Sequence, residues 1–561
     1  MIKKIFESKF IGLIIVIVIA SAVRLVAIGA VPYGIANDEV SYILSGYTIA
    51  HNGGVDIEGK FLPLSVNLDS SLSPVPVYIL SIATGILSLS PFAARLPFAL
   101  LGIGIVIIVY LLTLEVFKNR TMAFFAGLIL SLSSWHIIVT RTVWDVIPAQ
   151  FFYLLGLYIF VKKIKKGSVL WSLPAFLLGF FSYHGTKVFF AIFIVLIFAL
   201  YGKILWKRRG EFLLFTAGIL LIFSLFGFVA LTQSVTRQQE MIFTNKGVLL
   251  DAEKKIEFDR ARSTAPEFLK KIESNKITYF VEKMTYNYLG AFSSNYLFTV
   301  GDILPLVGYG VFFKGVLYLI DLPLLFLGII FLFLRSQLLI FKSSYERTEV
   351  SHYYRNGLVL LGGGLLLSPL PSTVGAGNSY FIRSFMMSPF LSILVGIGSF
   401  VVFKYLIKFR TFKIPMLVIF IAFYGLFVSR FLYQYYFQFN TFGSEYWNGS
   451  SRQIAEYILK NYDRFNSIVV VTSEDKVFFQ YALQSKANPK ELHDAWKKVW
   501  PVKFGKVSFA NSCFKDSELK SRLAPHTLYI VNDSCHINVR PTKTITDPME
   551  RLRVIWKLYE S

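Results

Sequence analysis

Charged side chains are scarce in this chain, and acidic ones are scarcer than basic ones. They make up 16% of the 561 residues, with 34 Asp and Glu against 57 Lys and Arg, while 55% of the residues are hydrophobic. Soluble domains usually carry about 25% charged residues. The deficit excludes an ordinary soluble protein of this length and indicates a protein of the lipid bilayer.

The shortage of acidic residues leaves a net charge of +23, which could indicate a nucleic-acid partner. The basic residues, however, fall mainly in short clusters between long apolar segments. Clusters in that position report the orientation of a membrane protein rather than binding to nucleic acid. We therefore expect no nucleic-acid partner.

Two motifs that mark common enzyme sites are also missing. The sequence has no His-Glu-x-x-His metal motif and no glycine-rich nucleotide loop after a strand. Its one run of three glycines, 362–364, lies inside an apolar segment, where close packing between helices explains it better. Without a fixed-spacing metal motif, the sequence leaves metal dependence open.

What the chain does contain is a series of apolar segments, each near the roughly 20 residues that a helix needs to cross the hydrocarbon core. Only helices satisfy every backbone polar group within one crossing segment. The first segment is long, contains Arg24 and lacks a convincing cleavage site, so we interpret it as a retained helix. The sequence predicts about eleven crossings, near 10–29, 96–116, 121–138, 147–161, 168–182, 187–202, 212–232, 310–334, 357–374, 384–403 and 414–430.

The apolar segment 74–90 decides the predicted topology. If it does not cross, every second loop is basic and lies on the side of the lysine-rich N-terminus, as the positive-inside bias requires. We therefore expect a plasma-membrane protein with a cytoplasmic N-terminus, and a helix at 74–90 that lies at the outer interface. The basic loops carry Lys118 and Arg120; Lys162, Lys163, Lys165 and Lys166; Lys203, Lys207, Arg208 and Arg209; Arg335, Lys342, Arg347 and Arg355; Lys404, Lys408, Arg410 and Lys413.

This topology divides the chain into two predicted domains. Residues 1–430 form a transmembrane domain with two long outer loops, 30–95 and 232–309. Residues 431–561 have the composition of a soluble domain and lie outside the cytoplasm. The fold class is therefore an α-helical polytopic membrane protein with a C-terminal extracytoplasmic α/β domain.

The C-terminal domain contains short apolar runs typical of buried strands, at 468–472 and 528–531, and a helical stretch at 451–462. It also holds the only two cysteines, Cys513 and Cys535. Outside the cytoplasm these thiols can oxidise. A disulfide and two unrelated buried thiols both remain open.

Two adjacent carboxylates, Asp38 and Glu39, follow the first predicted crossing and begin the first outer loop. A carboxylate there could remove the proton of an attacking hydroxyl. Acidic residues also favour helix starts, so the pair could simply begin a helix on the membrane surface.

The order of motifs along the chain resembles that of the GT-C glycosyltransferases, in the group related to protein O-mannosyltransferases and the aminoarabinose transferase that modifies lipid A. None of these motifs is specific by itself. The resemblance rests on their shared order along the chain and on their common position at the predicted outer face. It runs from about Phe10 to Lys404. The matching stretches are Asp38-Glu39, 56–63, Arg95-Leu96-Pro97, 141–145, Ser182-Tyr183-His184, 297–302, 368–371 and Arg383-Ser384.

The resemblance implies an inverting membrane glycosyltransferase that moves a sugar from a polyprenyl-phosphate donor to a hydroxyl acceptor on the outer face. It ranks Asp38 first as the general base and leaves Glu39 to hold the acceptor or a cation. It adds Asp145 and Asp302 as further acidic site residues. These four carboxylates could also hold a divalent metal, and the resemblance does not decide whether they do.

The leaving phosphate needs fixed cations, because its negative charge grows as the glycosidic bond breaks. Arg383 is the best candidate, since a guanidinium can bind phosphate oxygens in bidentate fashion. The other candidates are Arg95, Lys187, His184 and the neighbouring Tyr183.

Each of these residues has a plainer interpretation as well. Arg383 and Lys187 could be interfacial side chains that extend to the headgroups, His184 could bond a backbone carbonyl, and Tyr183 could pack. Asp145 could form a helical ion pair with Arg141, four residues earlier.

Two other function classes remain. One is a transporter or flippase of lipid-linked sugars, although such folds usually show matched halves and no internal repeat is visible here. The other is a polytopic receptor with an outer sensing domain. A polysaccharide ligase or polymerase that uses the same donor class is also open, and it would differ in its acceptor rather than in its chemistry.

Overall fold

The structure is a computed structural model in which two compact units are formed by non-contiguous parts of the chain. The first unit comprises residues 1–26, 98–141 and 145–431, and the second comprises 27–97, 142–144 and 432–561. The structure describes residues 10–68, 70–232, 241–302, 314–343, 349–377, 379–406, 413–442, 447–472, 476–496, 501–510, 512–513, 525–535, 539–547 and 553–560.

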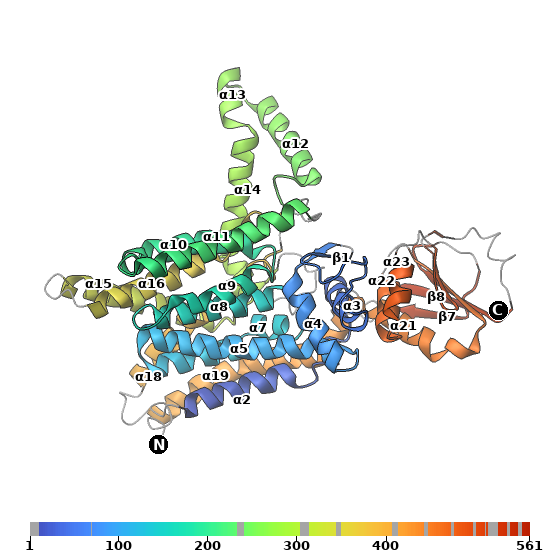
Figure 1. Cartoon of the computed structure of the whole chain (residues 1–561), viewed down its shortest axis with the longest axis horizontal. Helices are drawn as coiled ribbons and strands as arrows, with labels where there is room; N and C mark the ends of the chain where they lie inside the picture. Colours follow the sequence, from blue (N-terminus) through green and yellow to red (C-terminus); the bar gives the residue numbers. More distant parts are fainter. Residues whose placement is uncertain are drawn as a thin grey trace. The chain divides into compact units, whose positions relative to one another are not determined.

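The first unit is a bundle of long apolar helices that run side by side (Figure 1). Each of the eleven predicted crossings overlaps one of these helices or a consecutive pair. They are α2 (Ile11–Leu25), α5 (Pro91–Phe117), α6 (Arg120–Leu132), α7 (Ser134–Thr140), α8 (Val146–Lys163), η1 (Val169–Ser172), α9 (Leu173–Phe180), α10 (Thr186–Trp206), α11 (Arg209–Thr232), α15 (Asp321–Ser343), α16 (Glu349–Leu367), α17 (Leu370–Thr373), α18 (Met387–Leu406) and α19 (Lys413–Tyr433).

Six of the described helices are long and apolar enough to cross a membrane, and the bent pair α6 and α7 makes a seventh candidate. Shorter apolar helices cover Ile11–Leu25, Val169–Phe180 and Asp321–Leu334. The protein is thus a multi-pass membrane protein, while the count of eleven crossings stays a prediction. The segment at 74–90 forms the short apolar helix α4 (Pro74–Ile86). Three of the predicted crossings are short helices too, so helix length alone does not show whether α4 crosses the membrane or lies at its surface.

Glycine brings α15 and α18 to backbone contact. A Cβ at Gly328 would collide with the carbonyl oxygen of Leu394, and one at Gly398 would collide with that of Leu324. Small residues allow this approach in membranes, where dispersion contacts between helices replace hydrophobic burial. In the glycine run 362–364, the predicted close packing holds for Gly363, which faces Leu196 of α10, and for Gly364, which faces the Phe390 ring of α18, while Gly362 faces open space.

A buried arginine supports the 60° bend between α6 and α7. The bend interrupts the helical hydrogen bonds around Ser133, which leaves carbonyl groups without their helical donors. The Arg24 guanidinium donates to the carbonyls of Ser131 at 3.1 Å and Leu130 at 3.3 Å, and Nη2 lies 2.7 Å from His136 Nδ1. Arg24 of α2 is fully buried and thereby joins three helices.

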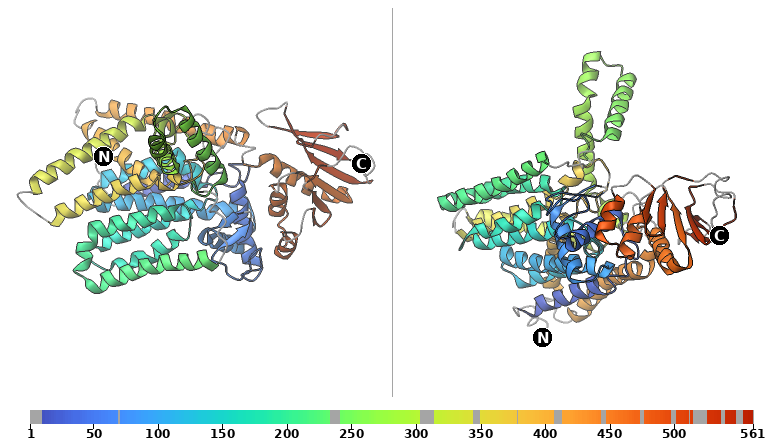
Figure 2. Two further views of the ribbon diagram at one scale, coloured as in Figure 1. Left: turned by 90° about the horizontal axis from the view of Figure 1, so that it is seen from above. Right: turned by 45° about the vertical axis from the view of Figure 1, so that its right-hand side comes forward.

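The second predicted outer loop, 232–309, contains a helical projection built from α12 (Lys246–Arg262), α13 (Glu267–Glu273) and α14 (Lys276–Gly290). It stands away from the helices of its own unit in Figure 1 and in the right-hand view of Figure 2. Exposed ion pairs join α12 to α14, Lys255 to Glu282 at 2.5 Å and Lys276 to Glu253 at 3.1 Å.

The second unit begins with the predicted first outer loop. Helix α3 (Asn37–His51) packs against α4, and a two-stranded antiparallel sheet of β1 (Val66–Leu68) and β2 (Ser70–Leu72) lies between them in the chain. The two helices approach closely at Gly46, where a Cβ would lie 2.9 Å from the backbone nitrogen of Ser81. This contact fixes α3, which carries the acidic pair.

A six-stranded mixed sheet forms the rest of the second unit, in the order β4-β5-β3-β6-β8-β7. The two predicted strands are β3 and β6, which pair in parallel at its centre. The strands are β3 (Ser467–Val471), β4 (Val502–Phe504), β5 (Val507–Ala510), β6 (Thr527–Asn532), β7 (Lys543–Thr546) and β8 (Val554–Glu560). The helices beside the sheet (Figure 1) are α21 (Gly449–Lys460), α22 (Lys476–Gln484) and α23 (Pro489–Trp496). The remaining short helices of the described residues are η3 (Asn295–Thr299), η5 (Gln434–Gln438), α20 (Phe439–Phe442) and η6 (Tyr462–Arg464).

The division into units differs from the predicted domains in the first loop and at the short stretch 142–144, both of which belong to the second unit. The predicted boundary at 430 lies one residue before the end of the first unit at 431. The loop 30–95, however, which we assigned to the transmembrane domain, belongs to the same unit as the C-terminal domain. The reason is a set of polar contacts between the two, described below.

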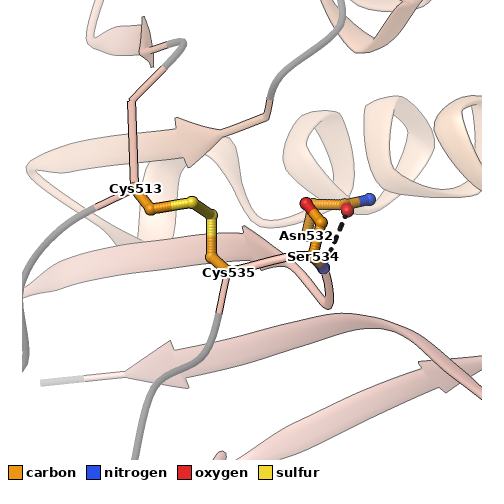
Figure 3. Close-up of a disulfide and its surroundings, with 4 residues drawn as sticks. All are labelled: Cys513, Asn532, Ser534 and Cys535. Carbon is orange, nitrogen blue, oxygen red and sulfur yellow. Dashed lines mark hydrogen bonds between the residues drawn. A yellow bond between two sulfur atoms is a disulfide. The ribbon is translucent and has the colours of Figure 1, made fainter.

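Of the two alternatives for the cysteines, the structure has the disulfide. Cys513 and Cys535 are joined, with their Cα atoms 5.5 Å apart (Figure 3). Cys535 is 2% exposed and packs in a core cluster with Val471 and Val531 of the two central strands. The bridge therefore fastens a loop to the centre of the sheet.

Candidate active site

The acidic pair lies in the first turn of α3, and its two members have different surroundings. Asp38 is exposed, whereas Glu39 is fully buried. Acidic side chains are favoured in this turn because the backbone N–H groups of a helix start carry partial positive charge. The pair does begin a helix, as the plainer interpretation predicted, but a helix start does not explain why Glu39 is buried.

A buried ion pair explains it. Arg95 donates from Nε to Oε1 of Glu39 at 2.7 Å and from Nη2 to Oε2 at 3.0 Å, and neither side chain is exposed. Bidentate pairing of this kind is the strongest arrangement that a carboxylate and a guanidinium can make. The charge of Glu39 is therefore neutralised inside the protein.

The remaining N–H groups of Arg95 are also used. Nη1 donates to the carbonyls of Pro32 at 2.7 Å and Ile28 at 3.4 Å, and Nη2 donates to that of Gly34 at 2.8 Å. A guanidinium has five N–H donors, and these contacts together with Glu39 account for five. The donors of Arg95, a predicted phosphate-binding candidate, are thus directed at Glu39 and at the chain that leads into α3.

Glu39 also connects α3 to the turn between α7 and α8. Its Oε1 accepts a hydrogen bond from the backbone N–H of Val143 at 3.2 Å. Asp145, two residues further along, directly precedes α8 and is 4% exposed. Arg141 ends α7 and donates to the carbonyls of Val23 and Arg24 at 3.0 Å each. Arg141 and Asp145 therefore flank a turn and do not lie on one continuous helix, as an ion pair along a helix would require.

Polar side chains of the C-terminal domain hold the chain immediately before Asp38. Asn448 donates to the carbonyl of Ile35 at 3.0 Å and to Oδ1 of Asn37 at 2.8 Å. Gln480 donates to the same carbonyl of Ile35 at 2.9 Å. Each of these donors lies more than 400 residues from its partner in the sequence.

A second group of contacts surrounds Tyr33. Its hydroxyl donates to Glu456 at 2.8 Å, and the Arg452 guanidinium lies 4.3 Å from the centre of its ring and donates to its carbonyl. Burial, followed by the hydrogen bond to Glu456, raises the pKa of the Tyr33 hydroxyl. At Gly34 no side chain fits, because a Cβ would collide with the backbone of Trp447.

The stretch 56–63 of the first loop forms a tight turn around Asp56. Its Oδ1 accepts from the backbone N–H groups of Glu58 at 3.0 Å and Lys60 at 2.7 Å. Burial raises the pKa of Asp56, against the effect of these hydrogen bonds. His493 of α23 bonds the carbonyl of Ile57, so the C-terminal domain contacts this turn as well.

In the first unit, the turn between α9 and α10 brings two predicted cations together. Lys187 Nζ lies 3.1 Å from Nδ1 of His184. The ammonium also lies over two aromatic rings, 5.6 Å from the centre of Phe180 and 5.0 Å from that of Phe226. Tyr183 is buried, as expected for a packing residue.

Asp302 and Arg383 act on the same short segment before α18. Asp302 accepts from the Ser379 hydroxyl at 2.9 Å and from the backbone N–H groups of Tyr380 at 3.2 Å and Phe381 at 3.3 Å. Arg383, two residues further on, donates to the carbonyl of Gly377 at 3.0 Å and is partly exposed. The carboxylate of Asp302 therefore fixes the segment that presents Arg383.

Seven of the nine predicted site residues thus fall into three groups, and Tyr183 and Asp145 are the other two. Glu39 and Arg95 pair in the second unit next to Asp38, His184 and Lys187 lie together in the first, and Asp302 supports the segment of Arg383. Across the described ranges, no group of three or more His, Cys, Asp and Glu side chains could hold a metal ion.

Sequence reasoning missed the residues that support the acidic pair from a distance. Asn448, Gln480 and Arg452 are ordinary polar residues in a soluble-type segment, and nothing in their local pattern distinguishes them. Arg24 did carry a signal, because a charged residue inside an apolar crossing is costly and is usually paired or functional.

Comparison with known proteins finds similarity to membrane glycosyltransferases. Residues 71–227, less than half of the chain, match the family model described as dolichyl-phosphate-mannose-protein mannosyltransferase. The match shows that this part of the chain is similar to that family, while the apolar helices make the chain a multi-pass membrane protein. Its sequence is similar to YkcB of Bacillus subtilis (strain 168), whose name assigns it provisionally to the mannosyltransferases: 33% identity over 103 residues, 18% of this chain and 14% of that protein.

Two solved structures are similar over most of this chain, at low identity. ArnT from Cupriavidus metallidurans, crystallised with undecaprenyl phosphate, has a TM-score of 0.49 and 12% identity, covering 97% of each chain. The Archaeoglobus fulgidus oligosaccharyltransferase, tethered to an acceptor peptide, has a TM-score of 0.44 and 15% identity, covering 84% of this chain and 62% of the other.

Proposed function

We propose that the protein is a membrane glycosyltransferase of the GT-C class, which moves a sugar from a polyprenyl-phosphate donor to a hydroxyl acceptor of a protein, lipid or glycan on the outer face of the plasma membrane, with Asp38 as the general base. The observation that carries the assignment is the contrast within the acidic pair. Glu39 is buried and paired with Arg95, whereas Asp38 is exposed on the same helical turn. A base must reach the hydroxyl that it deprotonates, and of the two acids only Asp38 has an exposed side chain.

The proposed reaction is a single displacement. The acceptor oxygen attacks the anomeric carbon while Asp38 takes its proton, and the bond from that carbon to the phosphate oxygen breaks. The electron pair leaves with the lipid phosphate, and the anomeric centre inverts because a single displacement occurs. Dolichyl phosphate, named in the description of the matching family, is a polyprenyl phosphate, which supports this donor class.

Arg383, with Lys187 and His184, is the proposed partner of the leaving phosphate. Arg383 is partly exposed and keeps donors beyond the one that Nη1 gives to Gly377, so a second edge of the guanidinium can meet phosphate oxygens. Asp302 would position Arg383 through the segment between them, and Asp145 would be a further acid near the acceptor. We propose a supporting rather than a phosphate-binding role for Arg95.

The proposed orientation rests on the alternating basic loops. It places the N-terminus in the cytoplasm and the sheet domain, with its disulfide, outside.

The test is sugar transfer by the full chain reconstituted in vesicles, with a panel of polyprenyl-phosphate sugars and product masses as the readout. Asp38→Asn should reduce turnover by at least about 100-fold, the lower end of what general-base removal costs, while donor binding stays intact. Asp463→Asn, the same change at a fully exposed aspartate of the C-terminal domain, is the matched control and should retain most of the activity. Turnover by Asp38→Asn equal to that of wild type would refute the assignment.

A further inference from the structure

A pocket of about 340 Å³ in the first unit lies outside the proposed catalytic machinery. Its walls are mostly aromatic and aliphatic, from Phe298, Tyr318, Phe423 and Phe427. Such walls alone would suit any apolar group. Two cations, Lys314 and Arg430, line the same pocket and give it a specific chemistry.

The two cations share the pocket without a carboxylate. No ion pair or hydrogen bond of the Lys314 or Arg430 side chain occurs among the described residues. Lys314 is partly buried, and Arg430 is exposed. The acid nearest in the chain, Asp321, does not line the pocket, and its oxygens accept from the Tyr318 backbone at 2.9 Å and the Tyr424 hydroxyl at 3.1 Å.

The position of the pocket indicates what could neutralise these charges. Arg430 lies in the last turn of α19, whose apolar stretch is among the membrane-crossing candidates, and Lys314 precedes α15. Cations at the ends of membrane helices lie at the depth of lipid headgroups. The rim is apolar and open, since Leu319 is 52% exposed and Leu426 is 63% exposed.

We propose that this pocket binds the phosphate group of a membrane lipid, with Lys314 and Arg430 on the phosphate oxygens and the exposed leucines along the lipid chain. A guanidinium and an ammonium together provide charge-assisted hydrogen bonds to a phosphate. The shared chemistry is a lipid-borne phosphate, which a phospholipid or a polyprenyl phosphate could supply. The assignment does not depend on the proposed catalytic function.

Native mass spectrometry of the purified full chain tests the site, with phosphatidylglycerol, diacylglycerol of the same chains, undecaprenyl phosphate and inorganic phosphate as probes. Phosphatidylglycerol or undecaprenyl phosphate should bind, and whichever binds more tightly identifies the source. Lys314→Gln and Arg430→Gln should each weaken that binding about tenfold, the effect of losing one charge-assisted hydrogen bond. Lys203→Gln, an exposed lysine at the end of α10, should bind as wild type does.

Three results would overturn the proposal. Equal binding of diacylglycerol would show that the pocket does not recognise the phosphate. Binding of inorganic phosphate as tight as that of the lipids would show that the pocket does not recognise the acyl or prenyl chain of the lipid. Unchanged lipid binding by the Lys314→Gln/Arg430→Gln double variant would place the lipid elsewhere.

A second inference concerns the C-terminal domain and rests on the proposed function. Asn448 and Gln480 donate three hydrogen bonds to Ile35 and Asn37, directly before Asp38. Both donors are buried or nearly so, with Asn448 4% exposed and Gln480 fully buried. We infer that they are positioning residues, which set the direction in which the first turn of α3 presents the base.

Small displacements of a base cost rate more than binding, because the proton must move as the acceptor attacks. Asn448→Ala/Gln480→Ala should therefore lower kcat about tenfold or more, with a donor KM within about twofold of wild type. Gln480→Glu, which keeps the shape but replaces the donor amide with an acceptor beside a carbonyl, should lower kcat as well. Arg464→Ala, an exposed change in the same domain, is the control.

The two possible failures can be distinguished. If wild type transfers no sugar from any donor, the proposed function fails. If wild type is active and the double variant matches it in kcat, only the positioning role fails. A fall in thermal stability with unchanged kcat would likewise assign the contacts to folding alone.

Discussion

Removal of Arg95 should destabilise the protein more than removal of any exposed charge. In Arg95→Met, Glu39 would stay buried without its partner, and the carbonyls of Pro32 and Gly34 would lose their donors. Breaking one side of a buried ion pair typically costs about 3–5 kcal/mol, because an uncompensated charge is left in a medium of low polarity. The carbonyls add to this cost only if water cannot reach them.

Replacement of both partners is the informative comparison. A well-packed apolar pair in place of a buried ion pair is often neutral or even stabilising. Arg95→Met/Glu39→Leu should therefore recover a large part of the stability that Arg95→Met loses, although the carbonyls still lack donors. Arg95→Lys should fall between wild type and Arg95→Met, because an ammonium cannot pair with both carboxylate oxygens and the backbone at once.

The assay is the time-dependent loss of the monodisperse peak of detergent-purified protein at a fixed temperature, since membrane proteins of this size rarely unfold reversibly. Lys60→Met is the matched control, because Lys60 pairs with Glu58 on the surface, at 44% side-chain exposure. Exposed pairs contribute about 0–1 kcal/mol. The reasoning is refuted if Arg95→Met lasts as long as Lys60→Met, or if the double variant lasts no longer than the single one.

Three further predictions follow from other contacts. Arg24→Met should sharply reduce the yield of folded protein, because the carbonyls freed at the bend between α6 and α7 lose their donor; a wild-type yield in size-exclusion chromatography would contradict this. Arg383→Ala should raise the donor KM more than the acceptor KM, and an equal rise in both would indicate a structural role. Alkylation without reductant should leave the intact mass unchanged, since Cys513 and Cys535 are joined; addition of two alkyl groups would refute the bridge.

The sequence by itself determined that this is a multi-pass membrane protein and where its helices lie along the chain. Apolar segments, basic loops and the compositional change near 430 depend on local residue types and on the thickness of a bilayer, so they can be recognised without tertiary contacts. The two central strands, β3 and β6, were predictable for the same reason, because short apolar runs with branched side chains suit buried strands. Asp38 and Glu39 were recognisable as candidates, but not distinguishable by local pattern.

Only the tertiary structure decided how the two acids differ and what supports them. Burial and pairing of Glu39 depend on Arg95, which lies 56 residues away, and the support of Ile35 and Asn37 depends on side chains more than 400 residues away. No periodicity or local propensity encodes such contacts. Hydrogen-bond partners at these separations are set by how whole elements pack, and the same packing grouped the first loop with the C-terminal domain.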